Sequence, residues 1–278
     1  MVPDPCNITW LLSFLKDNNI RLRSSLSQNF LIDKNITKKI VKQISNRNQT
    51  ICEIGSGAGA ITNEIILRYP QNKIHLVEID DLYAAHLRKT FPDTSIHHKD
   101  ILSVNITDFS EQQPITIIGN IPFGIASKII QHILPKNKLY NEVILVIQKE
   151  YGQRLCALSN TKDYSRLSIF TQLWCDVKPM FTISKTCFFP KPRVDSMVCK
   201  LTPHHQYRPS RISHIEQITK AAFHQRRKLL TTSLKSIISS DHLLEFLQQH
   251  NLPSSSRSEE LSVEHYVLLS EFIESKCR

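Results

Sequence analysis

Three glycines and two later carboxylates have the spacing of a nucleoside-binding site. The segment CEIGSGAGAIT places Gly55, Gly57 and Gly59 between a predicted strand and a predicted helix. Glycines in such a turn permit a tight bend and a close approach of the backbone to a ligand. Glu78 ends the next predicted strand, where a carboxylate can accept hydrogen bonds from both hydroxyls of a ribose. Asp100 ends the third predicted strand, where its carboxylate could reach the edge of an adenine.

The combination of these groups narrows the class of ligand. Three consecutive strand ends each present a polar residue where the nucleoside should lie, and Glu53 precedes the glycines on the first strand. The motif E-x-G-x-G-x-G with two later acids resembles the S-adenosylmethionine site of the class I methyltransferases. An NAD enzyme would need pyrophosphate contacts at a helix N-terminus. S-adenosylmethionine has no phosphate, which fits a glycine motif looser than GxGxxG.

A loop suited to chemistry on an amine follows the apolar run ITII. Pro122 cannot donate to a sheet ladder, so the strand must stop and a loop begins at Asn120. Loops at strand ends are where α/β proteins keep their chemistry. Asn120-Ile121-Pro122-Phe123 resembles the (Asp/Asn/Ser)-Pro-Pro-(Tyr/Phe) loop of amino-methyltransferases, in the form typical of RNA adenine dimethyltransferases. Phe123 replaces the more common tyrosine, which keeps stacking and loses any hydrogen bond from the hydroxyl.

Each residue type in this loop has a chemical reason. The exocyclic amine of adenine is a poor nucleophile because its lone pair is delocalised into the ring. The side-chain carbonyl of Asn120 and the main-chain carbonyl of Ile121 can grip its N–H groups and orient that lone pair. Pro122 keeps the turn rigid, and Phe123 offers a flat face to a flipped-out base, worth roughly 1–3 kcal/mol. Positioning and electrostatics then supply most of the rate, without a strong general base.

Strands and helices alternate between about residues 50 and 160. Short apolar runs predict strands at 50–55, 73–80, 94–102, 114–123 and 142–150. Amphipathic segments between these runs predict helices, and a further helix is expected at 31–44. Since the strands are continuous apolar runs, we expect a parallel sheet covered by helices on both faces.

The remainder of the chain changes character. Two further strands are predicted at 166–177 and 195–204, with a proline-containing loop at 188–196. Helical patterns without intervening strands follow at 215–238, 241–250 and 263–276. We therefore predict three parts, an N-terminal extension at 1–26, an α/β domain at 27–205 and a helical domain at 206–278.

Composition bounds the partners and the compartment. Lys and Arg number 35 against 25 Asp and Glu, a net charge of +10 that suits a polyanion or an anionic membrane surface. No stretch approaches the roughly 18 apolar residues of a spanning helix, and the first residues lack the basic region of a secretory signal. The 7 cysteines and 12 histidines form neither a CxxC pair nor an HxxxH pair. We therefore expect a cytoplasmic protein with no metal site.

Ordered motifs along the chain are similar to those of a known family. SQNFLID, EIGSGAGAIT, VEID, KDIL and GNIPF come first, and IQKEYGQRLCA, YSRLSIFTQLWCDV, FFPKPRVDSMV and FHQRRKLLTTSLK follow. In this order they resemble the small-subunit ribosomal RNA adenine dimethyltransferases, from about Ser27 to the C-terminus. The resemblance implies an α/β fold of the class I methyltransferase type, with a Rossmann-like sheet, helices on both faces and a small all-helical C-terminal domain.

The resemblance also implies a reaction and its residues. S-adenosylmethionine would methylate the exocyclic amines of two adjacent adenines in a hairpin loop near the 3′ end of small-subunit rRNA, leaving S-adenosylhomocysteine. The implied partner is the immature small ribosomal subunit, with the enzyme expected to act as a monomer in ribosome biogenesis. Cofactor contacts are expected from Asn29, Leu31, Gly55, Gly57, Glu78, Ile79, Asp100, Ile101 and Asn120. The target base is expected to meet Asn120, Ile121, Pro122 and Phe123.

Basic residues support an RNA partner independently. Phosphate contacts supply affinity without sequence information, and single-stranded loops are the usual targets of sequence-specific RNA readers. The candidate RNA contacts are Arg154, Arg166, Lys191, Arg193, Arg226, Arg227 and Lys228.

Three other functions share some of these features. A large-subunit rRNA adenine methyltransferase of the macrolide-resistance type shares the fold, the cofactor and the NIPF-like loop, but the FHQRRK and QKE…RL segments favour the small-subunit enzyme. A non-catalytic RNA-binding assembly factor on this scaffold could lose the amide of the loop, whereas Asn120 is present. An NAD-dependent oxidoreductase would need a GxGxxG motif and a catalytic Tyr, His or Lys constellation, and neither is found.

Overall fold

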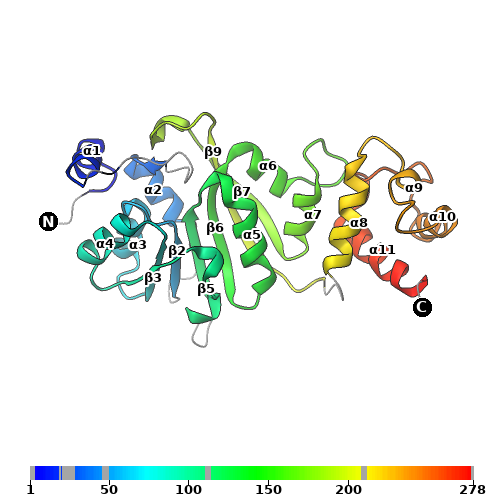
Figure 1. The fold of residues 1–278 in the computed structure, drawn as a ribbon, viewed down its shortest axis with the longest axis horizontal. Helices are drawn as coiled ribbons and strands as arrows, with labels where there is room; N and C mark the ends of the chain where they lie inside the picture. Colours follow the sequence, from blue (N-terminus) through cyan, green and yellow to red (C-terminus); the bar gives the residue numbers. More distant parts are fainter. Residues whose placement is uncertain are drawn as a thin grey trace. The chain divides into compact units, whose positions relative to one another are not determined.

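The computed structural model divides the chain into two compact units (Figure 1). Unit 1 comprises residues 1–152 and 176–203, and unit 2 comprises residues 153–175 and 204–278. The structure describes residues 4–18, 20, 29–45, 50–109, 114–207 and 212–276. Ser27 and Gln28, which begin the SQNFLID motif, lie outside these residues, as do parts of the predicted extension.

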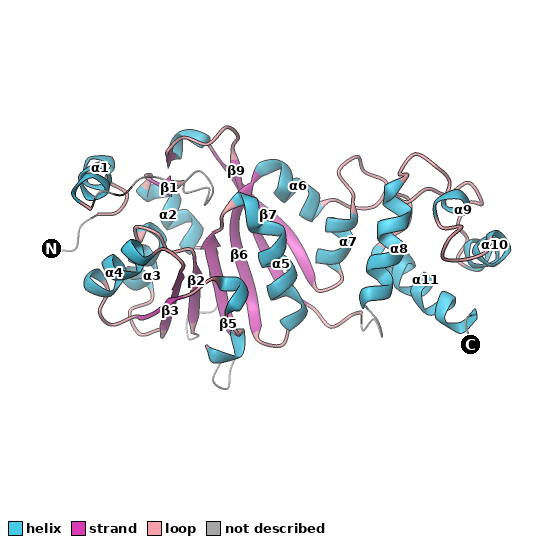
Figure 2. Cartoon of the chain, in the orientation of Figure 1, coloured by secondary structure: helices cyan, strands magenta, loops and turns pink. Residues whose placement is uncertain are grey.

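A seven-stranded sheet forms the centre of unit 1, in the order β4-β3-β2-β5-β6-β9-β7 (Figure 2). Its strands are β2 (Ile51–Ile54), β3 (Ile74–Glu78), β4 (Ser95–His98), β5 (Ile115–Asn120), β6 (Tyr140–Gln148), β7 (Cys175–Ile183) and β9 (Ser196–Pro203). The strands from β4 to β6 pair in parallel, which confirms the expected parallel arrangement. β9 pairs antiparallel with β6, so the complete sheet is mixed.

The central strands are buried along nearly their whole length, which explains why they read as continuous apolar runs. β2, β3 and β6 have buried residues at almost every position. Parallel strands of this kind need cover on both faces. Unit 1 provides α2 (Lys34–Val41), α3 (Ala60–Arg68), α4 (Asp81–Thr90) and α5 (Ala126–Ile133), and α6 (Lys149–Cys156) begins at its end. Figure 2 shows α5 lying in front of the sheet.

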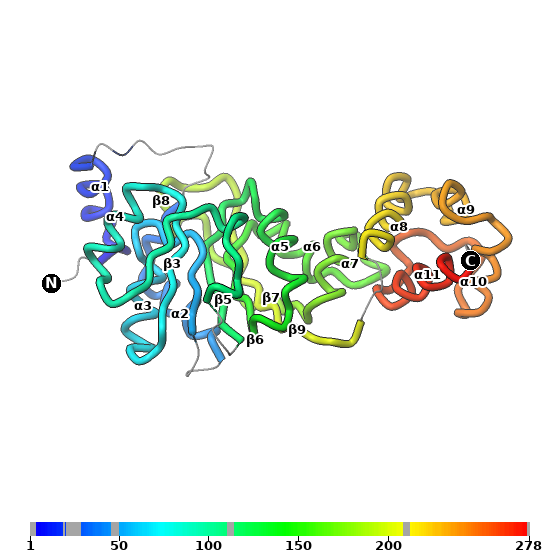
Figure 3. The backbone as a smooth tube through the Cα atoms, turned by 60° about the horizontal axis from the view of Figure 1, so that its bottom comes forward, coloured from blue at the N-terminus to red at the C-terminus, as the bar shows by residue number. Residues whose placement is uncertain are grey.

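The N-terminal helix α1 (Ile8–Asp17) begins at a side-chain cap. The Asn7 side-chain oxygen accepts hydrogen bonds from the N–H groups of Thr9 and Trp10, which satisfies donors that a helix start leaves without partners. α1 lies beside α4 in two views (Figures 1 and 3), and the ring of Phe14 on α1 lies 4.5 Å from that of His86 between centroids.

A second, two-stranded sheet joins distant parts of unit 1. β1 (Phe30–Leu31) pairs antiparallel with β8 (Phe188–Phe189), with Phe30 opposite Phe189. The N–H of Ile32 donates to the carbonyl of Cys187 at 2.9 Å and extends the pairing. The segment at 188–196 was predicted as loop, and its first two residues are instead this short strand.

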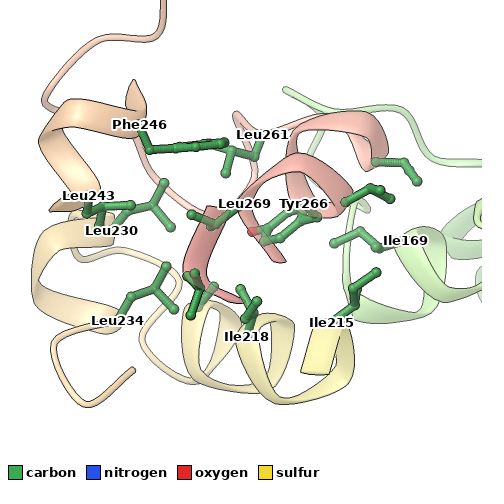
Figure 4. Packing of buried hydrophobic residues seen from close by; sticks show 14 of the residues in the cluster. Ile169, Ile215, Ile218, Leu230, Leu234, Leu243, Phe246, Leu261, Tyr266 and Leu269 are labelled. Carbon is green, nitrogen blue, oxygen red and sulfur yellow. The ribbon is translucent and has the colours of Figure 1, made fainter. Parts of the chain in front are cut away.

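Unit 2 has its own apolar core (Figure 4). Its helices include α7 (Arg166–Gln172), α8 (Ile212–His224), α9 (Leu230–Ser233), α10 (Ser240–Gln249) and α11 (Val263–Lys276). Tyr266 is fully buried in this core, and its hydroxyl donates to the carbonyl of Ser258 at 2.8 Å. A buried tyrosine needs such a partner, so this bond fixes how the 258–262 segment meets α11.

Two predicted elements were wrong. Residues 166–172 were predicted as strand and form α7, because Ser165 caps the helix reciprocally with Ser168 and overrides the apolar pattern. The single helix predicted over 215–238 is interrupted after His224, and α9 starts only at Leu230. The break is held by Arg226, whose guanidinium donates to the carbonyls of Thr161 and Lys162. Residues 153–175, assigned from the sequence to the α/β domain, belong to unit 2.

Candidate active site

One cavity at the carboxyl ends of the parallel strands of unit 1 collects the residues expected to do chemistry. This is the edge at which open α/β sheets bind their ligands. The expected cofactor and base contacts that line it are Asn29, Leu31, Gly55, Gly57, Glu78, Ile79, Asp100, Ile101, Asn120, Ile121, Pro122 and Phe123. The sequence therefore predicted which residues share the cavity, although not their mutual contacts.

The glycine loop after β2 has a backbone that only glycine adopts easily. Gly55, Gly57 and Gly59 have φ values of 70°, 51° and 88°. A Cβ at position 57 would also lie 3.2 Å from the ring of Phe30, which is tighter than an ordinary contact. The loop thus bends sharply between β2 and α3 and brings main-chain atoms to the cavity wall.

Glu78 supports this loop from the neighbouring strand. Its carboxylate is almost fully buried and accepts hydrogen bonds from the N–H of Gly57 at 2.8 Å and of Asp80 at 3.0 Å. Burial raises the pKa of Glu78, and the two main-chain hydrogen bonds oppose that rise. Each carboxylate oxygen can accept more than one hydrogen bond, so capacity remains for hydroxyl groups of a ligand.

A second buried carboxyl group, Glu53, lies beneath the glycine loop. It is 1% exposed, and the hydroxyl of Thr62 on α3 donates a hydrogen bond to it. Burial raises the pKa of Glu53 to about 8, with the bond from Thr62 acting in the opposite direction. The group is therefore mostly protonated at neutral pH, and it ties β2 to α3 without placing a second full charge beside Glu78.

Asp100, which follows β4, also lines the cavity. Its Oδ1 accepts a hydrogen bond from the N–H of Leu102 at 2.9 Å and caps the short helical turn Ile101–Ser103. This bond holds one carboxylate oxygen toward the main chain. Ile101 is buried beside it, and Ile79 after β3 is exposed at 51%. An apolar side chain so exposed at a cavity mouth is suited to a flat aromatic ligand.

The side-chain amide of Asn120, the last residue of β5, is held in one orientation by a hydrogen bond. Its Nδ2 donates to the main-chain carbonyl of Asn29 at 2.8 Å. Among the residues that the structure describes, none donates a hydrogen bond to its Oδ1. The bond from Nδ2 thereby assigns the two ends of the amide, which geometry alone leaves ambiguous.

The position of Asn120 depends on the glycine before it. A Cβ on Gly119 would lie 2.4 Å from the carbonyl oxygen of Ile54. β5 therefore approaches β2 more closely here than a residue with a side chain would allow. Ile121 is buried at 1% exposure, and Phe123 is half-buried at the start of the turn Phe123–Ile125.

Two aromatic residues that line the cavity were not predicted from the sequence. Phe30 from β1 and Tyr83 from α4 both line it, with ring centroids 5.4 Å apart. Tyr83 is 1% exposed, and burial raises the pKa of its hydroxyl. Phe30 lies inside the SQNFLID motif, so a signal existed for it. Tyr83 owes its place to the packing of α1 against α4, which no local pattern reveals.

The expected RNA contacts differ in how they are held. Arg154, Arg166, Lys191, Arg193, Arg227 and Lys228 are exposed. Arg226 is half-buried, donates to the carbonyls of Thr161 and Lys162, and lies 3.5 Å from the carboxylate of Glu259. The Arg226 side chain therefore joins segments within unit 2. Among the described residues, no group of three His, Cys, Asp or Glu could hold a metal ion, and no helix is long and apolar enough to cross a membrane.

A sheet of this order, whose loops after β2 and β5 meet over one cavity, is the fold of the Rossmann-like methyltransferases. A dimethyladenosine transferase from Plasmodium falciparum has the same fold, with a TM-score of 0.75, 22% identity, and coverage of 88% of this chain and 98% of that one. The 23S rRNA methyltransferase ErmE matches with a TM-score of 0.67 and 21% identity over 88% of this chain and 99% of its own.

The chain belongs to the ribosomal RNA adenine dimethylase family, whose model matches residues 19–275. It is similar to the ribosomal RNA small subunit methyltransferase A of Blochmanniella pennsylvanica, with 35% identity over 93% of this chain and 97% of the relative. The protein of the same name from Chlorobium phaeobacteroides is 34% identical over 93% of both chains. The chain is therefore an rRNA adenine dimethyltransferase.

Proposed function

We propose that this chain binds S-adenosylmethionine in the cavity of unit 1 and dimethylates the exocyclic amines of two adjacent adenines in a hairpin loop of small-subunit rRNA. The observation that carries the proposal is the orientation of Asn120. Its Nδ2 is occupied by Asn29, so its Oδ1 is the end available to an amine. Glu78, Asp100 and the glycine loop line the same cavity, which supports the cofactor and the base meeting there.

The residues present fit this cofactor. Gly57 lines the cavity with main-chain atoms only, and a Cβ at this position would press on the ring of Phe30, which lines the same cavity. Glu78 retains acceptor capacity for ribose hydroxyls beside its main-chain bonds. Ile79 and Ile101 supply apolar surface for the adenine ring, and Asp100 lies next to them to accept from its amine. Among the described residues that line the cavity, Lys99 is the one cation, in agreement with a nucleoside that carries no phosphate.

S-adenosylmethionine supplies an activated methyl group on a sulfonium centre. The chain's own contribution is to bind and orient the amine of the target adenine. Asn120 Oδ1 and the carbonyl of Ile121 accept from its N–H groups, which turns the nitrogen lone pair toward the incoming methyl group. Phe123 stacks on the base, and buried Ile121 excludes water from the amine. No side chain needs to act as a strong base, because the amine loses its proton only after it has become positively charged.

The substrate that we propose is the immature small ribosomal subunit, with RNA phosphates meeting the exposed cations. Lys191 and Arg193 follow β8 in unit 1, and Arg227 with Lys228 lies on the turn after α8 in unit 2. Every residue of the proposed cofactor and base site comes from unit 1 of one chain, which supports action as a monomer.

The test uses labelled S-adenosylmethionine, immature small subunits that lack the modification, and, separately, protein-free large-subunit rRNA. We expect label in paired dimethyladenines of the small subunit only. Label confined to the large-subunit RNA would assign the chain to the macrolide-resistance branch. If neither RNA is labelled while calorimetry shows that the cofactor still binds, the chain is a non-catalytic RNA-binding factor. Asn120→Ala is the control, expected to bind cofactor and to transfer no methyl group.

A further inference from the structure

The Asn120 side chain could serve its reaction in one orientation only. A carboxamide has an oxygen that accepts and an NH2 group that donates, and the two ends have nearly the same shape. An adenine amine brings N–H donors to the site. If the amide were reversed, donor would face donor, and the amine would not be held. Something in the protein must therefore decide which end faces the cavity.

We propose that the main-chain carbonyl of Asn29 is the positioning group that makes this decision. A main-chain carbonyl has no proton and can only accept, and this one lies 2.8 Å from Asn120 Nδ2. The bond therefore holds the NH2 end of the amide away from the target. Oδ1, which no described residue contacts as a donor, is then the end presented to the amine. This inference rests on the proposed function, because it specifies how the catalytic amide is prepared.

The small sheet holds the Asn29 carbonyl in place. Asn29 immediately precedes β1, whose residues Phe30 and Leu31 are buried and paired with Phe189 and Phe188. The bond from Ile32 N–H to the Cys187 carbonyl anchors the other end of the same strand. A backbone carbonyl next to a buried, paired strand has little freedom to turn, so it is a fixed reference for the side chain that binds it.

This arrangement also connects the catalytic amide to a segment far away in the chain. β8 runs directly into the loop that carries Lys191 and Arg193. Asn120, β1 and β8 thus form one hydrogen-bonded unit, in which the cations proposed to contact RNA follow the strand that holds Asn29.

The variant Asn120→Asp tests the carbonyl's role because it changes only the group that donates. An ionised carboxylate has no proton, so it would place oxygen against the oxygen of the Asn29 carbonyl. A protonated carboxyl group has an O–H that can donate to that carbonyl, while its other oxygen faces the amine as Oδ1 does. The protonated form is therefore the functional mimic of asparagine, and contact with the carbonyl raises the pKa of the introduced group.

Two readouts follow. The methylation rate of Asn120→Asp, divided by that of the parent at the same pH, is expected to rise as the pH is lowered from about 8 to about 5.5, approaching roughly tenfold per pH unit above the pKa of the new group. The midpoint of thermal unfolding without cofactor, relative to that of the parent, is also expected to rise as the pH is lowered. Because the folded-state pKa of the introduced carboxyl group is raised, the midpoint of Asn120→Asp relative to the parent is expected to fall as pH rises.

The outcomes separate this inference from the function on which it rests. If Asn120→Asp is active to the same relative extent at every pH, and its relative unfolding midpoint is flat, the Asn29 carbonyl does not set the orientation and the inference is wrong. Asn120→Ala has no titratable group and is expected to be inactive throughout the pH range. If Asn120→Ala instead methylates at near the parent rate, the proposed role of the loop itself is wrong.

Discussion

The carboxylate of Glu78, at the end of β3, accepts a hydrogen bond from the main-chain N–H of Gly57 across 2.8 Å. One acid therefore has two tasks, since it shapes the glycine loop and also faces the cavity. The motif suggested only a contact with the ribose. The loop's positive φ at Gly57 and the buried carboxylate explain why the two residues act as one structural unit.

Removing this carboxylate should weaken cofactor binding. Hydrogen bonds to a charged group are worth roughly 1.5–3 kcal/mol, so Glu78→Ala is expected to raise the Kd for S-adenosylmethionine about ten- to a hundredfold. Glu78→Gln keeps the side-chain volume but turns an NH2 group toward one of two N–H donors. This variant should lose nearly as much affinity for S-adenosylmethionine as Glu78→Ala. Titration calorimetry measures both, and an unchanged Kd in Glu78→Ala would contradict the assignment.

Gly119 tests how the catalytic loop is placed. Gly119→Ala puts a Cβ 2.4 Å from the Ile54 carbonyl, so β5 must move away from β2. The expected result is a loss of about 1–3 kcal/mol of unfolding free energy together with a large drop in methylation, because Asn120 is the next residue. Gly124→Ala on the exposed part of the same loop is the matched control for stability and should lie within about 0.5 kcal/mol of the parent. Equal stability of the two variants would show that β5 tolerates a side chain at this position.

Helix α1 should stabilise the wall of the cavity. Phe14 contacts His86 and lies 6.2 Å from the ring of Tyr83, which lines the cavity. Since Phe14 is half-buried, Phe14→Ala is expected to cost about 1–2 kcal/mol of unfolding free energy and to raise the Kd for cofactor severalfold. Leu12→Ala, on the 46% exposed face of the same helix, should change neither quantity. Equal effects of the two variants would show that α1 does not support the site through Phe14.

The protein should lose stability in mild acid. Burial lowers the pKa of His97, whose Nε2 lies 2.9 Å from Nδ1 of His75, and burial also lowers the pKa of His86. The unfolded chain then binds more protons than the folded chain below the ordinary histidine pKa of about 6.5. The contribution of these groups is complete above that pH and is lost progressively as pH falls from it through their lowered folded-state pKa values. Chemical denaturation at about pH 7.5 and about pH 5 measures this loss, which His97→Gln should reduce. A parent stability that is unchanged or higher at the lower pH would rule out this effect.

Two adjacent arginines should separate stability from RNA affinity. Arg226 donates to two carbonyls within unit 2, so Arg226→Ala is expected to lower the unfolding free energy by about 1 kcal/mol. Arg227 is exposed, so Arg227→Ala should leave the unfolding free energy unchanged and weaken RNA binding. It should also reduce by about 1 the slope of the logarithm of the RNA-binding constant against the logarithm of the salt concentration. Filter binding at several salt concentrations distinguishes them. If Arg227→Ala binds RNA as the parent does, this turn is not part of the RNA surface.

Local chemistry explains how much of the site the sequence could predict. Glu78, Asp100 and Asn120 were found because each ends a predicted strand, and parallel strands bring their carboxyl ends to one edge. The partners of these side chains were not found, because Asn29 and Gly57 contribute main-chain groups whose positions depend on tertiary structure. The helix at 166–172 was missed for a related reason. Its apolar residues suit either element, and a serine capping pair decided between them.

The role of Asn120 in methylating two adjacent adenines is tested by mass spectrometry of the 3′-terminal fragment of small-subunit rRNA, isolated from immature subunits after reaction with S-adenosylmethionine. We expect dimethyladenine at two adjacent positions with the parent protein, and unmodified adenine with Asn120→Ala although that variant still binds the cofactor. Dimethyladenine formed equally by both proteins would contradict this role, since the Asn120 carbonyl would then have no part in holding the amine.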